Sequence, residues 1–303
     1  MENIQASELS QKLPPVRQPF VPQTVIFSSV FKDTRPPLVT DSEIRLAENL
    51  CPDKIGPSIY RISESRVLKF GRAVHLDEAE ALCLLHRRAP SVPVPRVYNA
   101  YQLGDVSYIV MDYIHGQSLG DCWNGLSEGE KRSVIAQLRK HIKTWRAIKG
   151  EYYGSVGRGP CRDALFLHGY THIGLYGPFK SRPEFNEGVV QALRDSRPNP
   201  SQYNLPLERE IRKTQGDEII FTHGDLGPRN IMLKDGNITI LDWGGATYSI
   251  KELEFVQMKW QASQNQDWEA HIAELVPNDL PNFTSQYRFW NRLVNDMRLF
   301  SGI

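Results

Sequence analysis

The chain has 303 residues and a mass of 34.6 kDa; 40% of its residues are hydrophobic and 23% are charged. This composition is that of a folded globular protein and excludes the disordered, collagen-like and coiled-coil classes. Thirty-six Lys and Arg balance thirty-five Asp and Glu, so no general positive field draws the chain to nucleic acid or to an anionic membrane.

The cysteines and the first residues indicate where the protein works. Cys51, Cys83, Cys122 and Cys161 form no Cys-x-x-Cys pair and have no His nearby at metal-ligand spacing, so we expect reduced thiols. The start of the chain lacks a basic and apolar leader, and no apolar run approaches the roughly 18 residues of a membrane span. We therefore expect a cytoplasmic protein without a membrane partner.

Residues 1–39 predict an extended arm, either wrapped on the body of the protein or loose. Six of the twenty prolines lie there, and the segment has neither helical nor strand periodicity. The folded part begins at the capping box Thr40-Asp41-Ser42-Glu43, which predicts a helix with the apolar residues Ile44, Ala47 and Leu50 on one face.

The next segment predicts a small sheet. Ser58–Ile62 and Arg66–Phe70 are strand candidates joined by a polar turn, which together predict a hairpin. Leu76–Arg88 has a helical pattern that ends before a proline, and Val97–Gln102 and Val106–Met111 predict two further strands. The sequence therefore predicts a mostly antiparallel sheet of about four strands with one helix.

After this sheet the pattern becomes helical. A second capping box, Ser127-x-x-Glu130, begins a long apolar-striped helix that reaches Ile148. Residues 150–218 are rich in Gly, Pro and aromatic residues and predict irregular structure, whereas the chain from Lys251 onward predicts helices. The fold class is therefore α+β.

The chemically informative stretch lies at residues 221–244. Asp225 is followed five residues later by Asn230, and Asp242 comes twelve residues after that. Short apolar segments, which predict strands and a hairpin with its turn at Asp235-Gly236, flank these residues: Glu218–Thr222, Ile231–Leu233 and Ile238–Leu241. Each Asp or Asn alone would be a common turn residue, but the combined spacing on rigid supports favours a site.

The residue types at this spacing predict phosphoryl transfer. The amide oxygen of Asn230 and the carboxylate of Asp242 suit Mg²⁺, which takes oxygen ligands and completes its shell with water and substrate phosphates. Asp225 supplies a carboxylate beside them that can orient an attacking hydroxyl.

These motifs resemble a known family. His223-Gly224-Asp225, Asn230 and Asp242-Trp243 are similar to the catalytic and metal-binding loops of the aminoglycoside phosphotransferase and choline kinase group, small-molecule kinases with a protein-kinase-like fold. With Pro228-Arg229-Asn230 and Gly154–Arg162 included, the chain most resembles the fungal aminoglycoside-phosphotransferase-like proteins. The resemblance covers roughly residues 40–260 and is specific at residues 221–244.

The resemblance implies a bilobal protein-kinase-like fold in three parts. Residues 1–39 would be the arm, residues 40–114 a small antiparallel-sheet N-lobe that binds the nucleotide, and residues 115–303 a mostly helical C-lobe. The C-lobe would carry the catalytic loop, the metal site and the acceptor pocket. The implied cofactors are ATP and Mg²⁺.

The resemblance also predicts a lysine in the third strand, and Lys69 in Val67–Phe70 meets this expectation. Strand alternation turns Lys69 away from the face of its neighbours, so that it can point into a cleft and contact phosphates. Its expected partner is a glutamate on the following helix. We choose Glu78 over Glu80 because Glu78 shares a helical face with Leu82.

Two further nucleotide contacts follow from the resemblance. The phosphate-covering loop is reduced to Gly56-Pro57-Ser58, which is shorter than a Gly-x-Gly-x-x-Gly loop, so Gly56 and Ser58 are its candidates. The segment Met111–Ile114 resembles a kinase hinge, in which the carbonyl of Asp112 and the N–H of Ile114 would meet adenine. A plain linker is the alternative for this segment.

Arg229 stands four residues after Asp225, where tyrosine protein kinases have an Arg that reaches the transferring phosphoryl group. The same role suits its guanidinium fork. The alternative is a structural ion pair with an acid of the C-lobe such as Glu254.

The acceptor is not expected to be a polycationic aminoglycoside, which needs an acidic surface. Residues 115–303 hold twenty-three Lys and Arg against twenty-two Asp and Glu. A partly aromatic pocket for a less charged hydroxyl compound is one interpretation of residues 152–179, and a hydrophobic core is the other. The residues concerned are Tyr152, Tyr153, Phe166, His168, Tyr170, His172, Tyr176 and Phe179.

Taken together, the sequence predicts an ATP- and Mg²⁺-dependent kinase that phosphorylates a hydroxyl of a small metabolite. The alternative from another class is a catalytically silent kinase-like binding protein. A protein kinase is less favoured because no Ala-Pro-Glu segment follows Asp242. Oligomeric state is left open.

Overall fold

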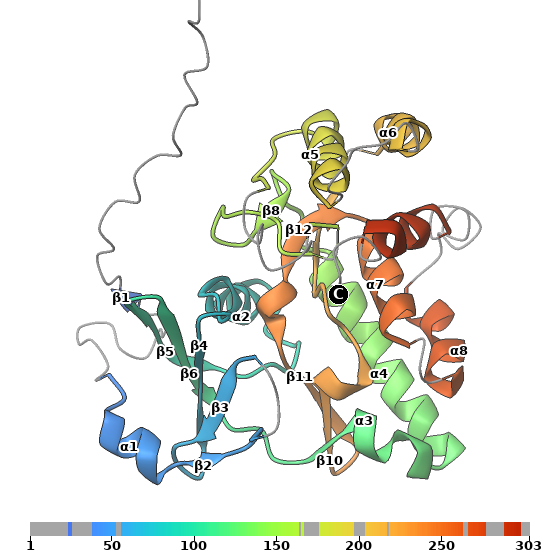
Figure 1. Cartoon of the computed structure of the whole chain (residues 1–303). Helices are drawn as coiled ribbons and strands as arrows, with labels where there is room; N and C mark the ends of the chain where they lie inside the picture. The colour runs from blue at the N-terminus through green and yellow to red at the C-terminus, as the bar shows by residue number, and fades with distance from the viewer. Residues whose placement is uncertain are drawn as a thin grey trace, which may run out of the picture.

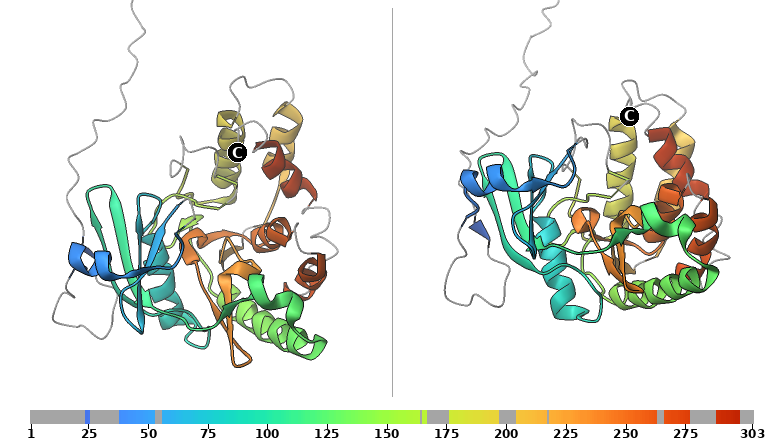
Figure 2. Two further views of the ribbon diagram at one scale, coloured as in Figure 1. Left: turned by 60° about the horizontal axis from the view of Figure 1, so that its bottom comes forward. Right: turned by 90° about the horizontal axis from the view of Figure 1, so that it is seen from below.

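The computed structural model describes residues 24–25, 38–52, 56–163, 165–166, 176–196, 204–216, 218–262, 266–276 and 288–297 (Figure 1). It consists of a sheet lobe, made of β1 to β6 with α1 and α2, and a helical lobe, made of the elements that follow. The two lobes lie side by side, and α2 lies on the side of the sheet that faces the helical lobe (Figures 1 and 2). None of the described helices is long and apolar enough to cross a bilayer.

The sheet lobe is built on one antiparallel sheet of order β1-β5-β6-β4-β3-β2. Its strands are β1 (Thr24–Val25), β2 (Glu48–Asn49), β3 (Ser58–Arg61), β4 (Arg66–Gly71), β5 (Val97–Leu103) and β6 (Val106–Asp112). The four strands expected from the sequence are therefore confirmed, and two short edge strands are added. One of them, β1, lies inside the arm and pairs with Ala100 and Tyr101, so at these two residues the extended arm lies against the sheet.

The two helices of this lobe differ in how closely they follow the sequence pattern. α1 (Asp41–Leu46) begins at the expected capping box, in which Thr40 and Glu43 bond reciprocally. It buries no residue and ends at Leu46, so Ala47 and Leu50 lie outside the helix and the expected helical face is wrong, although Ile44, Ala47 and Leu50 are each half-buried. α2 (Asp77–Arg88) follows the prediction and buries one whole side, including Leu82 and Leu85.

The helical lobe contains two helices that the sequence interpretation missed. Its described helices are α3 (Leu119–Cys122), α4 (Glu128–Arg146), α5 (Arg182–Asp195), α6 (Asn204–Lys213), α7 (Leu253–Gln261), α8 (Gln266–Leu275) and the helical residues 288–297. The expectation that residues 150–218 are irregular is wrong for α5 and α6. The signal was present, because Ser181 caps the backbone N–H of Glu184, and Phe185, Val189 and Leu193 repeat at four-residue spacing.

Two small sheets join these helices to the site. One has the order β11-β10-β7 and the other β8-β12-β9. The strands are β7 (Gln117–Ser118), β8 (Gly154–Ser155), β9 (Ile219–Thr222), β10 (Ile231–Lys234), β11 (Asn237–Ile240) and β12 (Thr247–Ile250). The predicted turn between β10 and β11 is confirmed, since Asp235 and Gly236 both have the positive φ that such a turn requires.

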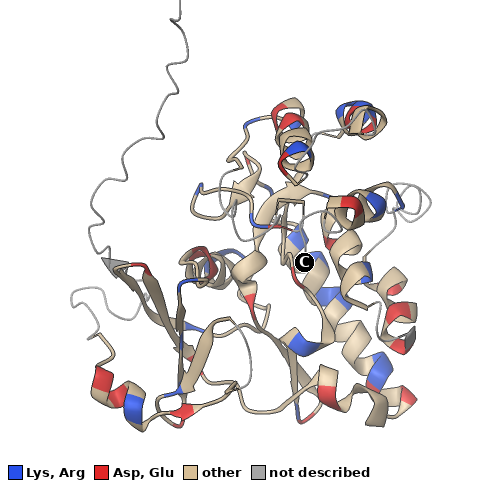
Figure 3. Cartoon of the chain, viewed as in Figure 1, with Lys and Arg blue, Asp and Glu red and all other residues tan. Residues whose placement is uncertain are grey.

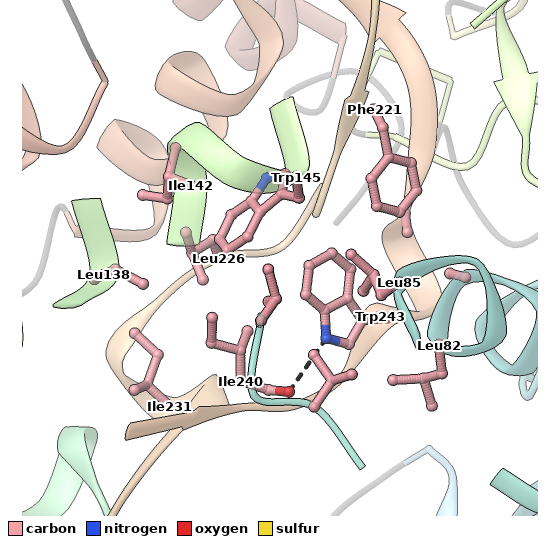
Figure 4. Packing of buried hydrophobic residues seen from close by; sticks show 14 of the residues in the cluster. Leu82, Leu85, Leu138, Ile142, Trp145, Phe221, Leu226, Ile231, Ile240 and Trp243 are labelled. Carbon is pink, nitrogen blue, oxygen red and sulfur yellow. Dashed lines mark hydrogen bonds between the residues drawn. The ribbon is translucent and has the colours of Figure 1, made fainter. Parts of the chain in front are cut away.

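The core continues from one lobe into the other. Trp243, which follows the metal-site candidate Asp242, packs edge-on against Trp145 of α4 and parallel to Phe221 of β9. Leu82 and Leu85 of α2 belong to the same buried cluster (Figure 4). The Trp243 indole donates a hydrogen bond to the carbonyl of Ile240 at 3.2 Å, which satisfies its polar atom inside this core.

Candidate active site

The catalytic-loop candidates are brought together by short-range contacts. β9 ends at Thr222, and the chain passes through Asp225 into a 3₁₀ turn over Pro228–Asn230. The Asn230 amide donates to the backbone carbonyl of Asp225 at 2.8 Å and to its carboxylate at 3.0 Å. Arg229 donates to both carboxylate oxygens of Asp225, at 2.9 and 3.0 Å. Asp225 therefore has a defined orientation set by its own loop.

His223 and Gly224 explain the shape of this loop. The imidazole of His223 is fully buried; its Nδ1 accepts from the backbone N–H of Asp225, so its Nε2 donates to the carbonyl of Leu241. This pair of bonds ties the catalytic loop to the strand end that precedes Asp242. Gly224 has a φ of 80°, and a Cβ there would collide with the carbonyl of Gly245, so the position requires glycine.

The alternative role considered for Arg229 is not formed. Glu254 of α7 is fully buried and accepts hydrogen bonds from the backbone N–H of His223 and from the indole of Trp145. Arg229 pairs with Asp225 instead. Glu254, the alternative partner considered for Arg229, therefore holds the backbone of His223 in the loop before Asp225.

Gln261 is a site residue that the sequence interpretation missed. It is the last residue of α7, and its amide donates a short hydrogen bond to Oδ1 of Asp225. No local spacing points to it, because 36 residues separate the two positions. The Asp225 carboxylate thus receives donors from its own loop and from a distant helix.

The lysine centre is assembled from three separate segments. Lys69 on β4 contacts Glu78 of α2 at 2.7 Å and Asp242 at 2.8 Å, with the Lys69 and Glu78 side chains only 7% and 3% exposed. Glu78, and not Glu80, is therefore the partner of Lys69. Asp242 adopts a left-handed conformation, with a φ of 58°, where β11 passes into the turn that carries Trp243.

Lys69 and Asp242 of this centre shift each other's pKa values toward the charged form. Burial alone would lower the pKa of Lys69, but the carboxylates of Glu78 and Asp242 outweigh it and raise that pKa above its usual value. Loss of water contact would raise the pKa of Asp242, but the Lys69 ammonium reverses the effect and holds this pKa below its usual range. Lys69 and Asp242 are therefore both charged at neutral pH.

A cavity of about 570 Å³ between the lobes connects these groups. Lys69, Glu78, Arg229, Asn230 and Asp242 all line it. Its apolar walls come from both lobes, namely from Leu50, Ile59, Val67, Leu82, Met111, Met232 and Leu241. A wider groove of about 710 Å³ lies along α4, but it contains none of the predicted residues. The chemistry therefore points to the cavity between the lobes.

The hinge candidates line this cavity, whereas the phosphate-loop candidates do not. Asp112 and Ile114 are both at its wall, and the Asp112 side chain is engaged elsewhere, accepting from the Tyr98 hydroxyl at 2.6 Å. Gly56 and Ser58 are absent from its described lining. Ser58 pairs with Phe70 on the strand positions next to the Ile59 and Lys69 pair, so alternation turns its side chain to the other face of the sheet.

Asn230 and Asp242 both line the cavity and could hold a divalent cation there. Since the Asn230 amide nitrogen is bound by Asp225, its oxygen is the atom left for a metal. Asp242 has one oxygen on Lys69, and 46% of its side chain is exposed. Two oxygen ligands with open positions suit Mg²⁺, which keeps several waters and phosphate oxygens.

The aromatic residues once considered for the acceptor belong mainly to a core. Tyr153, Phe166 and Tyr176 are buried in a cluster with Phe185 and Leu193 of α5, and Phe179 packs against that cluster. Tyr152 is buried beside Tyr248 of β12. The core interpretation therefore holds for the described members of the set; His168, Tyr170 and His172 lie outside the described residues.

The fold and the site define a kinase-like phosphotransferase, and the comparisons with known proteins agree. Residues 56–276 match the model of the phosphotransferase enzyme family. An aminoglycoside 3'-phosphotransferase of Streptomyces ribosidificus is 24% identical over 182 residues, which are 59% of this chain and 60% of that protein. This chain thus covers less than two thirds of that relative.

Two solved structures share the fold. A thermostable mutant of the aminoglycoside phosphotransferase APH(4)-Ia, in a ternary complex with ADP and hygromycin B, superimposes with a TM-score of 0.54 at 14% identity, covering 83% of each chain. A putative fructosamine-3-kinase from Haemophilus somnus 129PT has a TM-score of 0.52 at 15% identity, covering 84% of this chain and 90% of its own.

The chain belongs to the phosphotransferase enzyme family, whose model spans most of its length. The expected α+β, protein-kinase-like bilobal fold is confirmed by the shared architecture of these structures.

Proposed function

We propose that the protein transfers the γ-phosphoryl group of ATP to a hydroxyl of a small metabolite, with Mg²⁺ as the metal. The observation that carries the proposal is the convergence of Lys69, Glu78, Asp242 and Asn230 at one cavity between the lobes, with the Asp225 carboxylate bound to Asn230 beside that cavity. A structure of the related fold holds ADP, which supports an adenine nucleotide.

In this proposal the nucleotide occupies the cavity with adenine at the hinge backbone of Asp112 and Ile114. Lys69, held by Glu78, contacts the α- and β-phosphates. Asn230 and Asp242 would hold Mg²⁺, which when bound neutralises phosphate charge. Gly56 and Ser58 keep their proposed place in the phosphate-covering loop, although the described lining of the cavity lends them no support.

The group transfer itself is assigned to Asp225. Its carboxylate orients the acceptor hydroxyl and accepts the hydroxyl proton, while the acceptor oxygen bonds to the γ-phosphorus and the bond to the β-phosphate bridging oxygen breaks. Arg229, which now holds Asp225, reaches toward the transferring group in this scheme. The products are ADP and the phosphorylated acceptor.

The acceptor class is proposed to be a hydroxyl compound without several positive charges. Acidic and basic residues are mixed along the described helices of the helical lobe (Figure 3), which supports an acceptor other than a polycation, since a polycation needs an acidic surface. Residues 40–114 remain the proposed nucleotide lobe and residues 115–303 the proposed acceptor lobe.

The test is ATP turnover by the whole chain with Mg²⁺ and a library of hydroxyl metabolites, followed as ADP release. We expect turnover with at least one uncharged or singly charged acceptor. Undiminished turnover in Asp242→Asn would contradict the metal assignment, since that change removes a ligand charge from the site.

One observation favours the second candidate, a silent nucleotide-binding protein: the short loop at Gly56 and Ser58 lies away from the described cavity wall. Thermal denaturation with and without millimolar Mg-ATP tests whether the protein binds nucleotide, because a ligand that binds the native state raises the melting temperature. A clear shift without turnover of any acceptor would support the silent protein.

A further inference from the structure

The segment Gly154–Arg162 is the motif that the proposed chemistry leaves without a role. None of its described residues lines the cavity between the lobes. The segment is nevertheless firmly built. The Tyr152 hydroxyl donates to the carbonyls of Ser155 and Val156, at 2.9 and 2.8 Å, and the N–H of Arg158 bonds back to Ser155 at 3.1 Å.

This segment contacts the first turn of α2, across the boundary between the lobes. Nε of Arg162 lies 2.7 Å from the carboxylate of Asp77, and the two side chains are only 15% and 17% exposed. Gly157 faces the carboxylate of Glu80, and Gly159 that of Asp77, so closely that a Cβ on Gly157 would crowd Glu80. The absence of a side chain at Gly157 leaves room for the carboxylate of Glu80 on α2.

The contact joins the two halves of the site. Asp77 directly precedes Glu78, whose carboxylate holds Lys69. On the other side, β8 (Gly154–Ser155) pairs with β12, and β12 pairs with β9, the strand that leads into the catalytic loop. A single hydrogen-bonded path therefore runs from the helix of Glu78 to the strand before Asp225.

From this geometry we infer that residues 154–162 form an interlobe dock in which Arg162 and Asp77 are positioning residues that hold Glu78 against Lys69. The inference rests on the proposed function in one respect: Glu78 needs to stay in place because it holds Lys69 for the phosphates. The dock acts on the position of α2, and neither Arg162 nor Asp77 touches the cavity.

The physical need for such a dock follows from where Glu78 lies. Its carboxylate is almost fully buried, so it stabilises the centre only while the Lys69 ammonium stays beside it. α2 belongs to the sheet lobe, while Asp242 comes from the helical lobe. Leu82 and Leu85 already join the middle of α2 to the core shared by both lobes. The ion pair of Arg162 with Asp77 attaches the first turn of the helix, which carries Glu78, to the helical lobe as well.

The first experiment measures the protection of Lys69 directly and needs no turnover. The full chain is treated with an amine-acylating reagent, and labelling of Lys69 is followed by mass spectrometry. We expect Arg162→Ala and Asp77→Asn to raise the labelling rate of Lys69 about tenfold, the factor that corresponds to a 1.4 kcal/mol loss of protection. Labelling of Lys69 at the wild-type rate in both variants would overturn the dock.

A matched control separates the dock from a general loss of stability. Lys131→Ala removes a comparably buried cation, 11% exposed, that joins α4 to Asp267 of α8 away from the cavity. It lowers the melting temperature in the same manner but leaves Lys69 protected. If Lys131→Ala raised labelling as much as Arg162→Ala does, the specific role of the dock would be refuted. Asp77→Asn, which keeps the side-chain shape, serves if Arg162→Ala does not fold.

A second experiment asks whether Arg162 acts through Glu78. Arg162→Ala is made in the wild type and in Glu78→Gln, and kcat for ATP turnover is compared in the four proteins. We expect a loss of about tenfold in the wild type and of less than about twofold in Glu78→Gln. Equal losses in both backgrounds would overturn the inference, whereas a wild type without any turnover would refute the proposed function and leave the labelling result to decide the dock.

Discussion

The catalytic loop and the lysine centre reach the same cavity by different routes. Asp225, Arg229 and Asn230 lie within six residues and bond to one another through a single turn. Lys69, Glu78 and Asp242 come from a strand, a helix and a distant strand end, and they meet only when the lobes are assembled. A substitution in the locally built loop can therefore reduce activity without reducing stability. A substitution in the lysine centre, which joins the two lobes, is expected to reduce both.

The largest expected effect on turnover is that of Asp225→Asn. Loss of the proposed base lowers kcat about 10³-fold, because a positioned base contributes roughly two to four orders of magnitude. The melting temperature stays near that of the wild type, since the loop bonds that Asn230 makes to the backbone of Asp225 remain. Steady-state kinetics and calorimetry measure the two quantities. The matched control is Asp235→Asn, the same change in the exposed turn of the neighbouring hairpin, which leaves kcat unchanged.

Lys69→Met is expected to reduce both activity and stability. It removes a phosphate contact, and it leaves Glu78 buried without its cation, which costs about 3 to 5 kcal/mol of unfolding free energy. Turnover falls about 10²-fold. Chemical denaturation of Lys69→Met and of the Lys69→Met/Glu78→Gln pair tests the cause.

In the double variant the buried charge is gone, so stability returns while activity does not. A double variant as unstable as Lys69→Met would show that packing, and not the unpaired carboxylate, causes the loss. Return of turnover in the double variant would contradict the phosphate-contact role of Lys69.

Gln261→Ala tests whether a long-range contact also matters within the locally built loop. The change removes one donor from the Asp225 carboxylate. Because hydrogen bonds to charged groups contribute about 1.5 kcal/mol, we expect kcat to fall about tenfold. Lys259→Ala, on the same helix and paired with Glu269, provides the control. A kcat for Gln261→Ala equal to that of the control would make the catalytic loop a purely local unit.

Asp163→Asn has the smallest expected effect on turnover and probes stability alone. Burial raises the pKa of Asp163 to about 7, while the backbone N–H of Leu165 donates to one of its oxygens. Because the folded state binds this proton more tightly than the unfolded chain, the wild type loses stability as pH rises from about 4 to about 7.

Asn keeps the acceptor for Leu165 and carries no charge, so the stability advantage of Asp163→Asn grows through this window and levels off above it. Calorimetry of both proteins at pH 5 and pH 8 measures the difference, and kcat serves as the control because Asp163 does not line the cavity. An advantage that is the same at both pH values would mean that Asp163 does not titrate there.

Helix and strand patterns in the sequence predicted most of the fold, because they depend on contacts between residues close in the chain. The capping boxes at Thr40 and Ser127 form as expected, since both partners lie within four residues. The expected apolar face of α1 does not form because the helix ends at Leu46, before Ala47 and Leu50. α5 and α6 were missed although their apolar spacing is clear, because the surrounding Gly and Pro were given more weight than the periodicity.

The residues of the candidate site likewise fall into those that local patterns predict and those that they do not. Asp225, Asn230 and Asp242 could be predicted because their order and spacing are written along one short stretch, and His223 fits the same pattern. Glu78 could be chosen over Glu80 because helical periodicity places it toward the sheet. Gln261 and Arg162 carry no such local signal, since their partners lie 36 and 85 residues away.

The sequence by itself determined most of the secondary elements around the cleft, the order and spacing of the candidate residues Asp225, Asn230 and Asp242, and the family to which the chain is similar. These depend on interactions between residues close in the chain, whose geometry the backbone period sets. Only the tertiary structure decided that Glu254 holds the backbone of His223 and not Arg229, that the aromatic segment is largely core, and that Arg162 meets Asp77. Those outcomes depend on which distant segments pack together, and no local pattern encodes them.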